Sequence, residues 1–281
     1  MKVVPLAAES LGVRSMATYV EAGRLRILMD PGATLGPRRF NLPPAAEEEE
    51  ALDRALGRIE SYALRAQLIT VSHYHQDHVL TSPELYAGRR VWAKDPHRMI
   101  AVEQRSRAHA FWRGVRPTSI LESAEGRTHD FGDVTVRISP PLAHGSDGGR
   151  FGFVVAVTVD DGVRFIHGSD VQGPLSAVAT AYLLRERPQL LYLSGPPTYL
   201  EFQLGRAEIE RGVDNLLRIV EATGCQVIMD HHALRDLDRG RRLARLYATG
   251  RVVSAAGYLG RPDELLEARR AALWRRARRA R

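Results

Sequence analysis

Cysteine and long apolar runs are nearly absent from this chain of 281 residues. Its one cysteine, Cys225, cannot form an internal disulfide, so a disulfide-stapled fold is excluded. No stretch reaches the roughly 18 apolar residues of a membrane span, and residues 1–6 lack the apolar core of a signal peptide. We therefore expect a soluble, cytoplasmic protein that does not associate with membranes.

Lysine is also scarce, and arginine carries nearly all of the positive charge. The formal net charge is +7, and residues 235–281 hold 14 arginines against five acidic residues. This basic region can be interpreted as a surface for nucleic acid or another polyanion. The preference for arginine along the whole chain favours the alternative, a solvated arginine-rich face that binds nothing in particular.

The hydrophobic pattern predicts strands in the first part of the chain and alternating helices and strands later. We expect strands at 3–6, 17–21, 25–29, 67–72, 90–93, 134–138, 153–159, 163–166, 190–193, 226–229 and 252–254. We expect helices at 45–64, 96–113 (with Met99, Val102 and Phe111 inward), 175–186, 206–222, 236–248 and 262–279. Gly224 and Gly250 stand where helix C-caps belong.

No repeat or low-complexity linker divides the sequence. Residues 1–281 are therefore expected to form a single α/β sandwich domain, with an arginine-rich C-terminal helix at about 262–281.

Four metal-binding side chains lie within six residues, in the pattern H-x-H-x-D-H: His73, His75, Asp77 and His78. The motif follows a short buried strand. On extended backbone His73 and His75 project to the same side, and the following loop turns Asp77 and His78 toward a neighbouring point. A chance match is on the order of one in a thousand, so this segment predicts ligands for two adjacent metals.

Three further segments place ligand residue types at strand ends. His144 lies in a Pro- and Gly-rich loop, Asp170 ends an apolar strand, and His231 and His232 follow another strand. Strand ends along one sheet edge converge, so these side chains are expected to meet the first motif. The two oxygens of Asp170 allow it to bridge two cations.

This order of residues resembles the metallo-β-lactamase superfamily, from the segment 28–32 through His231. Within it, segments 194–200 and 230–236 are similar to an uncharacterised, mostly archaeal family of predicted metal-dependent hydrolases. The resemblance implies a four-layer αββα sandwich. It also implies a first metal held by three histidines, a second metal, a bridging Asp170 and a supporting Asp30. The ligands would be His73, His75 and His144 for the first metal, and Asp77, His78 and His231 for the second.

The late histidine pair leaves a choice of ligand. Adjacent residues on extended backbone point to opposite sides, so one of the two is expected to face the metals. We favour His231, because it follows the strand at once and its spacing to Arg235 resembles the phosphodiesterase branch. His232 would then contact substrate or donate a proton. Tyr199 lines the substrate pocket or stiffens its loop.

The resemblance implies a hydrolase in which a hydroxide bridging two metals attacks an ester or phosphoester, with Asp77 orienting the nucleophile. The cofactors would be two divalent ions; zinc fits best, and iron or manganese also suits such a ligand set. The alternative is a nuclease or phosphodiesterase whose basic C-terminal region binds the phosphates of RNA or DNA. A third hypothesis is a di-iron redox module. About sixty residues separate Asp170 from His231, too few for the cap of the large processing nucleases.

Overall fold

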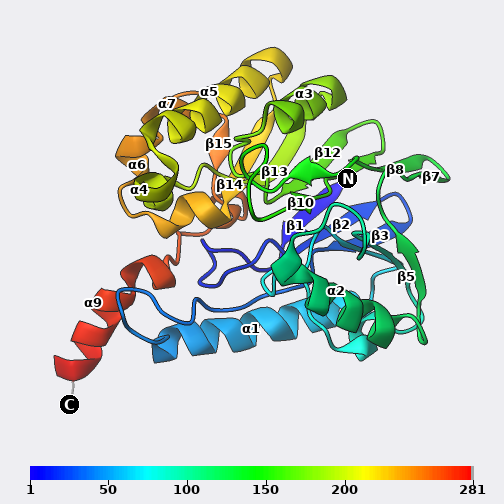
Figure 1. The fold of residues 1–281 in the computed structure, drawn as a ribbon, viewed down its shortest axis with the longest axis horizontal. Coiled ribbons are helices and arrows are strands. Elements are labelled where there is room, and N and C mark those ends of the chain that lie inside the picture. The colour runs from blue at the N-terminus through cyan, green and yellow to red at the C-terminus, as the bar shows by residue number, and fades with distance from the viewer. Residues whose placement is uncertain (280–281) are drawn as a thin grey trace.

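Two β-sheets packed face to face form the centre of the molecule, a computed structural model that describes residues 1–279 (Figure 1). The first sheet has the order β1-β2-β3-β4-β5-β6, antiparallel from β1 to β3 and parallel from β3 to β6. Its strands are β1 (Lys2–Pro5), β2 (Thr18–Ala22), β3 (Leu25–Met29), β4 (Leu68–Val71), β5 (Arg90–Ala93) and β6 (Ile120–Ser123).

The second sheet has the order β15-β14-β13-β12-β11-β8-β7 and is parallel from β12 to β15. Its strands are β7 (Thr128–Phe131), β8 (Val134–Ile138), β11 (Val157–Asp160), β12 (Arg164–Ser169), β13 (Leu190–Ser194), β14 (Gln226–Asp230) and β15 (Val252–Val253). A short ribbon, β9 (Leu142–Ala143) with β10 (Phe153–Val154), lies beside it. Parallel strands place their carboxyl ends at one edge, and this edge carries the functional loops.

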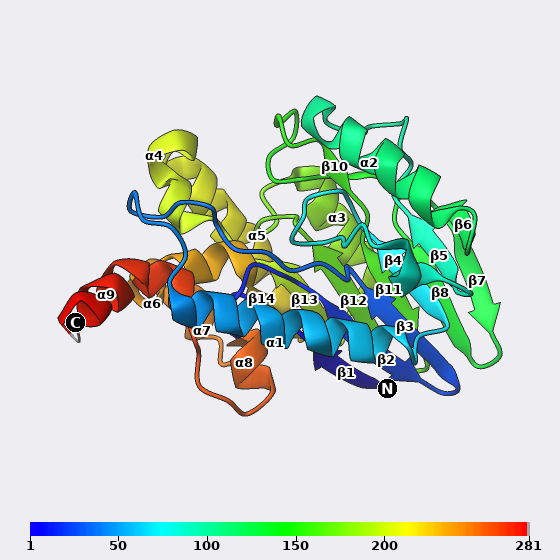
Figure 2. The ribbon, with the colours of Figure 1, turned by 90° about the horizontal axis from the view of Figure 1, so that it is seen from below.

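Helices cover both outer faces, as Figures 1 and 2 show. The main ones are α1 (Ala46–Ala63) and α2 (Val102–Val115) on the first sheet, and α3 (Ala177–Glu186) and α5 (Arg206–Thr223) on the second. The shorter elements are η1 (Pro83–Tyr86), η2 (Thr198–Leu200), α4 (Glu201–Leu204), η3 (His231–Arg235), α6 (Arg239–Arg242), α7 (Ala244–Tyr247) and α8 (Ala255–Tyr258). The last helix is α9 (Leu266–Arg279).

Three layers of buried apolar side chains confirm the αββα order. Ile59 of α1 packs with Ile69 of β4 in the first layer. Ile27 and Phe165 lie in the layer between the two sheets, and Leu216 of α5 lies in the layer over the second sheet. Central strands such as β4 therefore bury both faces, which explains why several read as unbroken apolar runs, whereas the edge strands β6 and β7 remain largely accessible.

The predicted helix over 96–113 begins six residues late. Its first residues form a turn in which the Asp95 carboxylate accepts hydrogen bonds from the amides of His97 and Arg98. Met99 and Val102 are consequently exposed, against the prediction, whereas Phe111 is buried as expected. The hydrogen bonds of the Asp95 carboxylate to these free amides stabilise a turn where the spacing of apolar residues had predicted a helix.

Other boundaries also differ from the predictions. The predicted strand 153–159 is broken into β10 and β11, and the predicted helix 236–248 into α6 and α7. Strands β6 and β7 and helix α8 were not predicted. Gly224 caps α5 in the left-handed conformation as expected, while Gly250 lies two residues beyond the C-cap of α7. Of the helices within residues 1–279, none is long and apolar enough to cross a membrane.

Helix α9 is tied down at its base and extends away from the sheets in both views (Figures 1 and 2). Arg270 forms two hydrogen bonds of 2.7 and 2.8 Å with Glu48 of α1, and both side chains are fully buried. Glu267 pairs with Arg14 through two contacts of 2.6 Å. Charged pairs therefore anchor this helix together with the apolar contacts of Leu266 and Ala268.

We predict that Glu48→Gln destabilises the protein by about 3–5 kcal/mol, because the buried Arg270 guanidinium then keeps its charge without a partner. Urea unfolding monitored by circular dichroism measures the change. Glu49→Gln is the matched control, since Glu49 is exposed on the same helix turn and its loss should cost under about 0.5 kcal/mol. Equal losses for the two variants would contradict the role of the pair.

Candidate metal centre

The seven predicted ligands meet at the carboxyl ends of strands from both sheets. The H-x-H-x-D-H loop follows β4, and His144 comes directly after β9. Asp170 follows β12, and His231 follows β14. Segments more than 150 residues apart in sequence thus come together at one edge of the sandwich, as the strand-end argument predicts.

The first group of ligand atoms contains three imidazoles and one carboxylate: His73, His75, His144 and Asp170. The Nε2 atom of His73 lies 3.1 Å from Nδ1 of His75 and 3.8 Å from Oδ2 of Asp170. The Nε2 atom of His144 lies 3.1 Å from the same oxygen. All four side chains therefore offer an atom to one common point.

The second group contains Asp77, His78 and His231. The Nε2 atom of His231 lies 3.4 Å from Oδ2 of Asp77 and 3.6 Å from Oδ1 of Asp170. The Nε2 atom of His78 is 3.4 Å from Oδ2 of Asp170. Asp170 thus lies between the two groups, with one oxygen toward His144 and the other toward His231.

These separations fit metal ions. Two ligand atoms bound about 2.1 Å from one tetrahedral ion stand about 3.4 Å apart. Among the described residues, Nε2 of His78, Nε2 of His144 and Oδ1 of Asp170 are buried without a hydrogen-bond partner. Buried polar atoms are rarely left unpaired, so the donor set and its unpartnered atoms suit divalent cations.

The electrostatics of the centre also favour cations. Burial lowers the pKa of His73 well below its usual value, and it lowers the pKa of His75 to about 4, so both rings are neutral and offer lone pairs. Burial alone would raise the pKa of Asp170, but the imidazoles of His231 and His78 hold it well below its usual range. The Asp170 carboxylate is therefore ionised and surrounded by imidazole nitrogens.

Asp30, predicted to support the centre, contacts it through His78, and with His73 and His78 it also forms a group that could hold a metal ion. Its Oδ2 atom is 2.9 Å from Nδ1 of His78, which leaves Nε2 of that ring facing Asp170. The same carboxylate accepts hydrogen bonds from Ser72 and Ser169. A carboxylate that holds the far nitrogen of a histidine fixes the ring's orientation and tautomer.

Three residues at the centre adopt positive φ although none is glycine: Asp30 at 46°, Ser169 at 51° and His231 at 54°. Such left-handed conformations are costly and persist where the surroundings enforce them. Gly32 is required for a steric reason, because a Cβ there would stand 2.1 Å from the amide nitrogen of Val79. Only glycine lets this loop pack against the ligand motif.

The two late histidines do not point to opposite sides, because the backbone is not extended there. His231 begins the 3₁₀ turn η3 with positive φ, and the two rings lie 4.6 Å apart. His231 faces Asp77 and Asp170, whereas His232 lies 3.4 Å from Asp170 and 3.1 Å from the Tyr199 hydroxyl. His232 therefore links the centre to the cleft wall.

Sequence reasoning missed Glu9, which contacts the His231 ring. The Oε2 atom of Glu9 is 3.2 Å from Nδ1 of His231, and its other oxygen accepts a 3.0 Å hydrogen bond from Arg235. Asp230 accepts hydrogen bonds from the amides of Ser10 and His231, which fixes the Glu9 loop beside the ring. No local motif marks Glu9, because its partners lie more than 200 residues away.

A cleft of about 330 Å³ opens over the centre. Its lining includes Asp77, Asp170 and His232 together with Tyr199 and Phe151. The predicted pocket role of Tyr199 agrees with this position. The candidate ligands Asp77 and Asp170 thus line a cleft that a substrate could enter.

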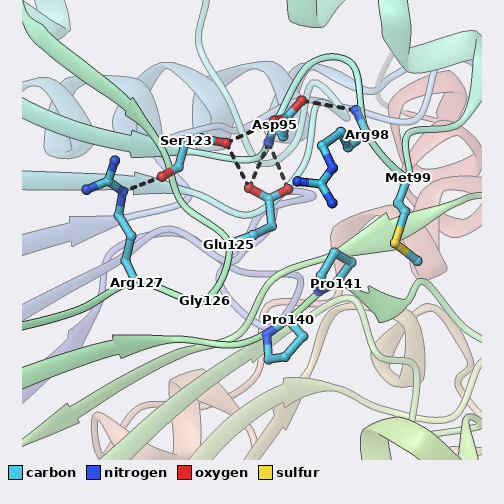
Figure 3. A pocket seen from close by; sticks show the side chains of 9 residues that line it. All are labelled: Asp95, Arg98, Met99, Ser123, Glu125, Gly126, Arg127, Pro140 and Pro141. Atoms are coloured by element: carbon cyan, nitrogen blue, oxygen red, sulfur yellow. Dashed lines mark hydrogen bonds between the residues drawn. The ribbon is translucent and has the colours of Figure 1, made fainter.

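A larger hollow of about 540 Å³ lies elsewhere, between the end of β5 and Pro140–Pro141 (Figure 3). Its carboxylate, Glu125, accepts hydrogen bonds from the amide of Asp95 and the hydroxyl of Ser123 and pairs with buried Lys94 at 2.6 Å. These polar groups bond to one another and connect the ends of β5 and β6. We therefore assign them a structural role.

The architecture and centre together place this chain in the metallo-β-lactamase fold. An isothiocyanate hydrolase from Delia radicum gut bacteria matches with a TM-score of 0.55 at 14% identity, over 90% of this chain and 95% of that one. Zn²⁺-bound PqqB from Methylobacterium extorquens matches with a TM-score of 0.50 at 11% identity, over 90% and 98%. Because the sequence identity is so low, these matches establish the shared fold alone.

The particular family follows from sequence comparison. The chain is 42% identical over 295 residues to a UPF0282 protein of Thermococcus gammatolerans, covering 99% of this chain and 96% of that protein. It is 40% identical to the UPF0282 protein of Methanopyrus kandleri, covering 96% and 98%. The chain belongs to the UPF0282 family. No protein-family model matches it.

We predict that Glu9→Gln weakens metal affinity about 10- to 100-fold, because the amide no longer fixes the tautomer and position of the His231 ring. Chelator titration followed by elemental analysis measures the metal retained. Glu267→Gln is the control: it breaks a similar arginine pair nearby, with Arg14, without touching a ligand histidine. Retention equal to that of the unaltered protein would refute the role of Glu9.

Proposed function

We propose that this protein is a binuclear metal-dependent hydrolase acting on an ester or phosphoester substrate. The observation that carries the proposal is the position of Asp170 between the two groups of ligands. Its Oδ2 atom faces His144 of the first group and His78 of the second, and its Oδ1 atom faces His231 of the second. Metallohydrolases with two ions use such a shared carboxylate to hold them a few ångströms apart. The cleft above Asp170 leaves one open side for substrate.

His73, His75 and His144 would hold one ion, and Asp77, His78 and His231 the other. Two divalent cations bound there lower the pKa of water and stabilise the negative charge that develops during hydrolysis. Nitrogen and carboxylate donors in this proportion suit zinc best, and iron or manganese next. The structural relative PqqB is Zn²⁺-bound, which supports zinc as a candidate.

Asp77 has the position and charge to orient the attacking water. It lines the cleft, and although burial alone would raise its pKa, nearby His78, His231 and Arg235 lower it. A carboxylate of low pKa is a weak base, so we assign it a hydrogen bond to the nucleophile and not full proton removal.

Tyr199 and His232 stand on the opposite wall of the cleft, joined by a hydrogen bond of 3.1 Å. Burial lowers the pKa of His232 to about 3, so its ring is neutral near pH 7. Nε2 of this ring faces Asp170 and Nδ1 contacts the Tyr199 hydroxyl, so the ring can position that hydroxyl toward the substrate. We assign this pair to substrate contact.

We predict hydrolysis of at least one of four substrates by the metal-loaded protein: bis-p-nitrophenyl phosphate, a lactone, a thioester and a short RNA. Zinc, manganese and iron should each be supplied, and metal removal should abolish the activity. Asp77→Ala should lower kcat at least about 100-fold, because the nucleophile loses its orientation. Activity that survives this change would belong to another protein or refute the mechanism.

The second candidate is a nuclease or phosphodiesterase acting on RNA or DNA. Helix α9 favours it, because its outer half carries the exposed residues Arg275, Arg276, Arg278 and Arg279, for which no ion pair is formed within residues 1–279. The helix projects beyond the body of the protein (Figure 2). Such a basic arm can contact phosphates outside the cleft.

If α9 grips nucleic acid, RNA affinity should fall steeply with salt, since each phosphate contact releases counterions. Replacing Arg275, Arg276, Arg278 and Arg279 by Gln should reduce the slope of log affinity against log salt by up to about three. Fluorescence anisotropy with a labelled RNA measures this. An unchanged slope assigns α9 a solvated surface role.

A further inference from the structure

We propose that the cleft selects substrates with an anionic group beside the bond to be broken, and that Arg107 of α2 binds this group. The proposal rests on the proposed hydrolase function and names its substrate class. Arg107 lines the cleft together with His75, Asp77 and Asp170. No sequence motif marks it.

Arg107 is held in place from the ligand loop itself. Its Nε atom donates a 2.7 Å hydrogen bond to the carbonyl of Tyr74, the residue before His75. One turn earlier on α2, Gln104 accepts a hydrogen bond from the amide of Tyr74 at 2.8 Å. The backbone beside the metal centre thus fixes the guanidinium through one nitrogen only.

The other two arginines of the cleft already have acidic partners. Arg14 pairs with Glu267 at 2.6 Å, and Arg235 pairs with Glu9 at 3.0 Å. Within residues 1–279, by contrast, no carboxylate pairs with Arg107, and its two terminal nitrogens form no hydrogen bond with this part of the chain. Arg107 is the free cation of the cleft lining in the described chain.

The other charged groups of the cleft leave the Arg107 guanidinium available to bind an anion. The carboxylates that line the cleft, Asp77 and Asp170, both face imidazoles of the metal centre. With divalent ions bound they are neutralised, so Arg107 adds to a positive cleft. A planar guanidinium pairs with two oxygens of a carboxylate or phosphoryl group, and such pairs are strong where water is partly excluded.

The remainder of the substrate has room in an adjoining hollow of about 590 Å³. It shares His144, Phe151 and Leu200 with the cleft and continues along Leu204. Its lining is mixed, with Phe151 and Leu204 beside the polar side chains of Arg150 and Gln203. A substrate with its charge near the scissile bond and a remainder that has both apolar and polar groups fits both regions.

The test compares esters that differ in charge: neutral p-nitrophenyl acetate, the carboxylate mono-p-nitrophenyl succinate and the phosphodiester bis-p-nitrophenyl phosphate. Arg107→Gln in the metal-loaded protein should lower kcat/KM about 10- to 100-fold for the charged substrates, the effect of losing a charged hydrogen bond. The neutral ester should change less than about two-fold. Arg107→Lys should recover part of the loss, because it restores charge without the planar fork.

Arg105→Gln is the matched control, since Arg105 is exposed on the same helix two residues away and the change removes the same charge. Equal effects of the Arg105 and Arg107 changes would overturn the proposal, as would an equal loss on neutral and charged esters. A loss confined to the phosphodiester identifies a phosphoryl group as the ligand, and a loss confined to the succinate identifies a carboxylate.

Calorimetry with inorganic phosphate and with succinate separates this proposal from the hydrolase function. Arg107→Gln should weaken binding of at least one anion about ten-fold, with no change for Arg105→Gln. If no ester is hydrolysed but this difference appears, the anion site stands and the hydrolase proposal fails. If esters are hydrolysed and neither anion distinguishes the two variants, the hydrolase stands and the role of Arg107 is overturned.

Discussion

One buried carboxylate, Asp170, organises the functional edge of this protein. Imidazoles from the loops after β4, β9 and β14 face its two oxygens at 3.1–3.8 Å. A lone charge buried this deeply would be strongly unfavourable, so Asp170 is compatible with the fold only because positive or polar groups surround it. The buried charge of Asp170 therefore explains both why these loops converge and why the site favours cations.

The surrounding structure meets that constraint with further buried carboxylates. Asp30 holds His78 from one side of the centre, and Glu9 holds His231 from the other. Three non-glycine residues with positive φ aim these loops. Rigid sheets on both sides supply the support that such strained loops require. A well-ordered centre in turn allows the cleft to discriminate by charge, because Arg107 is fixed relative to the ligands.

Much of the candidate site could be read from local pattern, because metal chemistry restricts residue types and strand ends expose them. The H-x-H-x-D-H motif, His144, Asp170 and His231 were all located this way, and the structure brings them together. The weaker predictions concerned helix starts and short strands. Met99 and Val102 are exposed because the Asp95 carboxylate capped a turn instead of letting the helix begin. Strand β6 pairs with β5, which lies about 30 residues earlier in the sequence. The local sequence of β6 therefore gives little indication that it forms a strand.

The sequence by itself determined the sandwich class, the order of most strands and helices, and the identity of the ligand residue types, since each depends on short-range periodicity and spacing. Tertiary structure alone decided that both His231 and His232 reach Asp170, that Glu9 supports the centre, and that Arg107 lies in the cleft without a carboxylate partner among residues 1–279. These features depend on which distant charges become neighbours. That outcome is set by how the two sheets pack, and no local pattern encodes it.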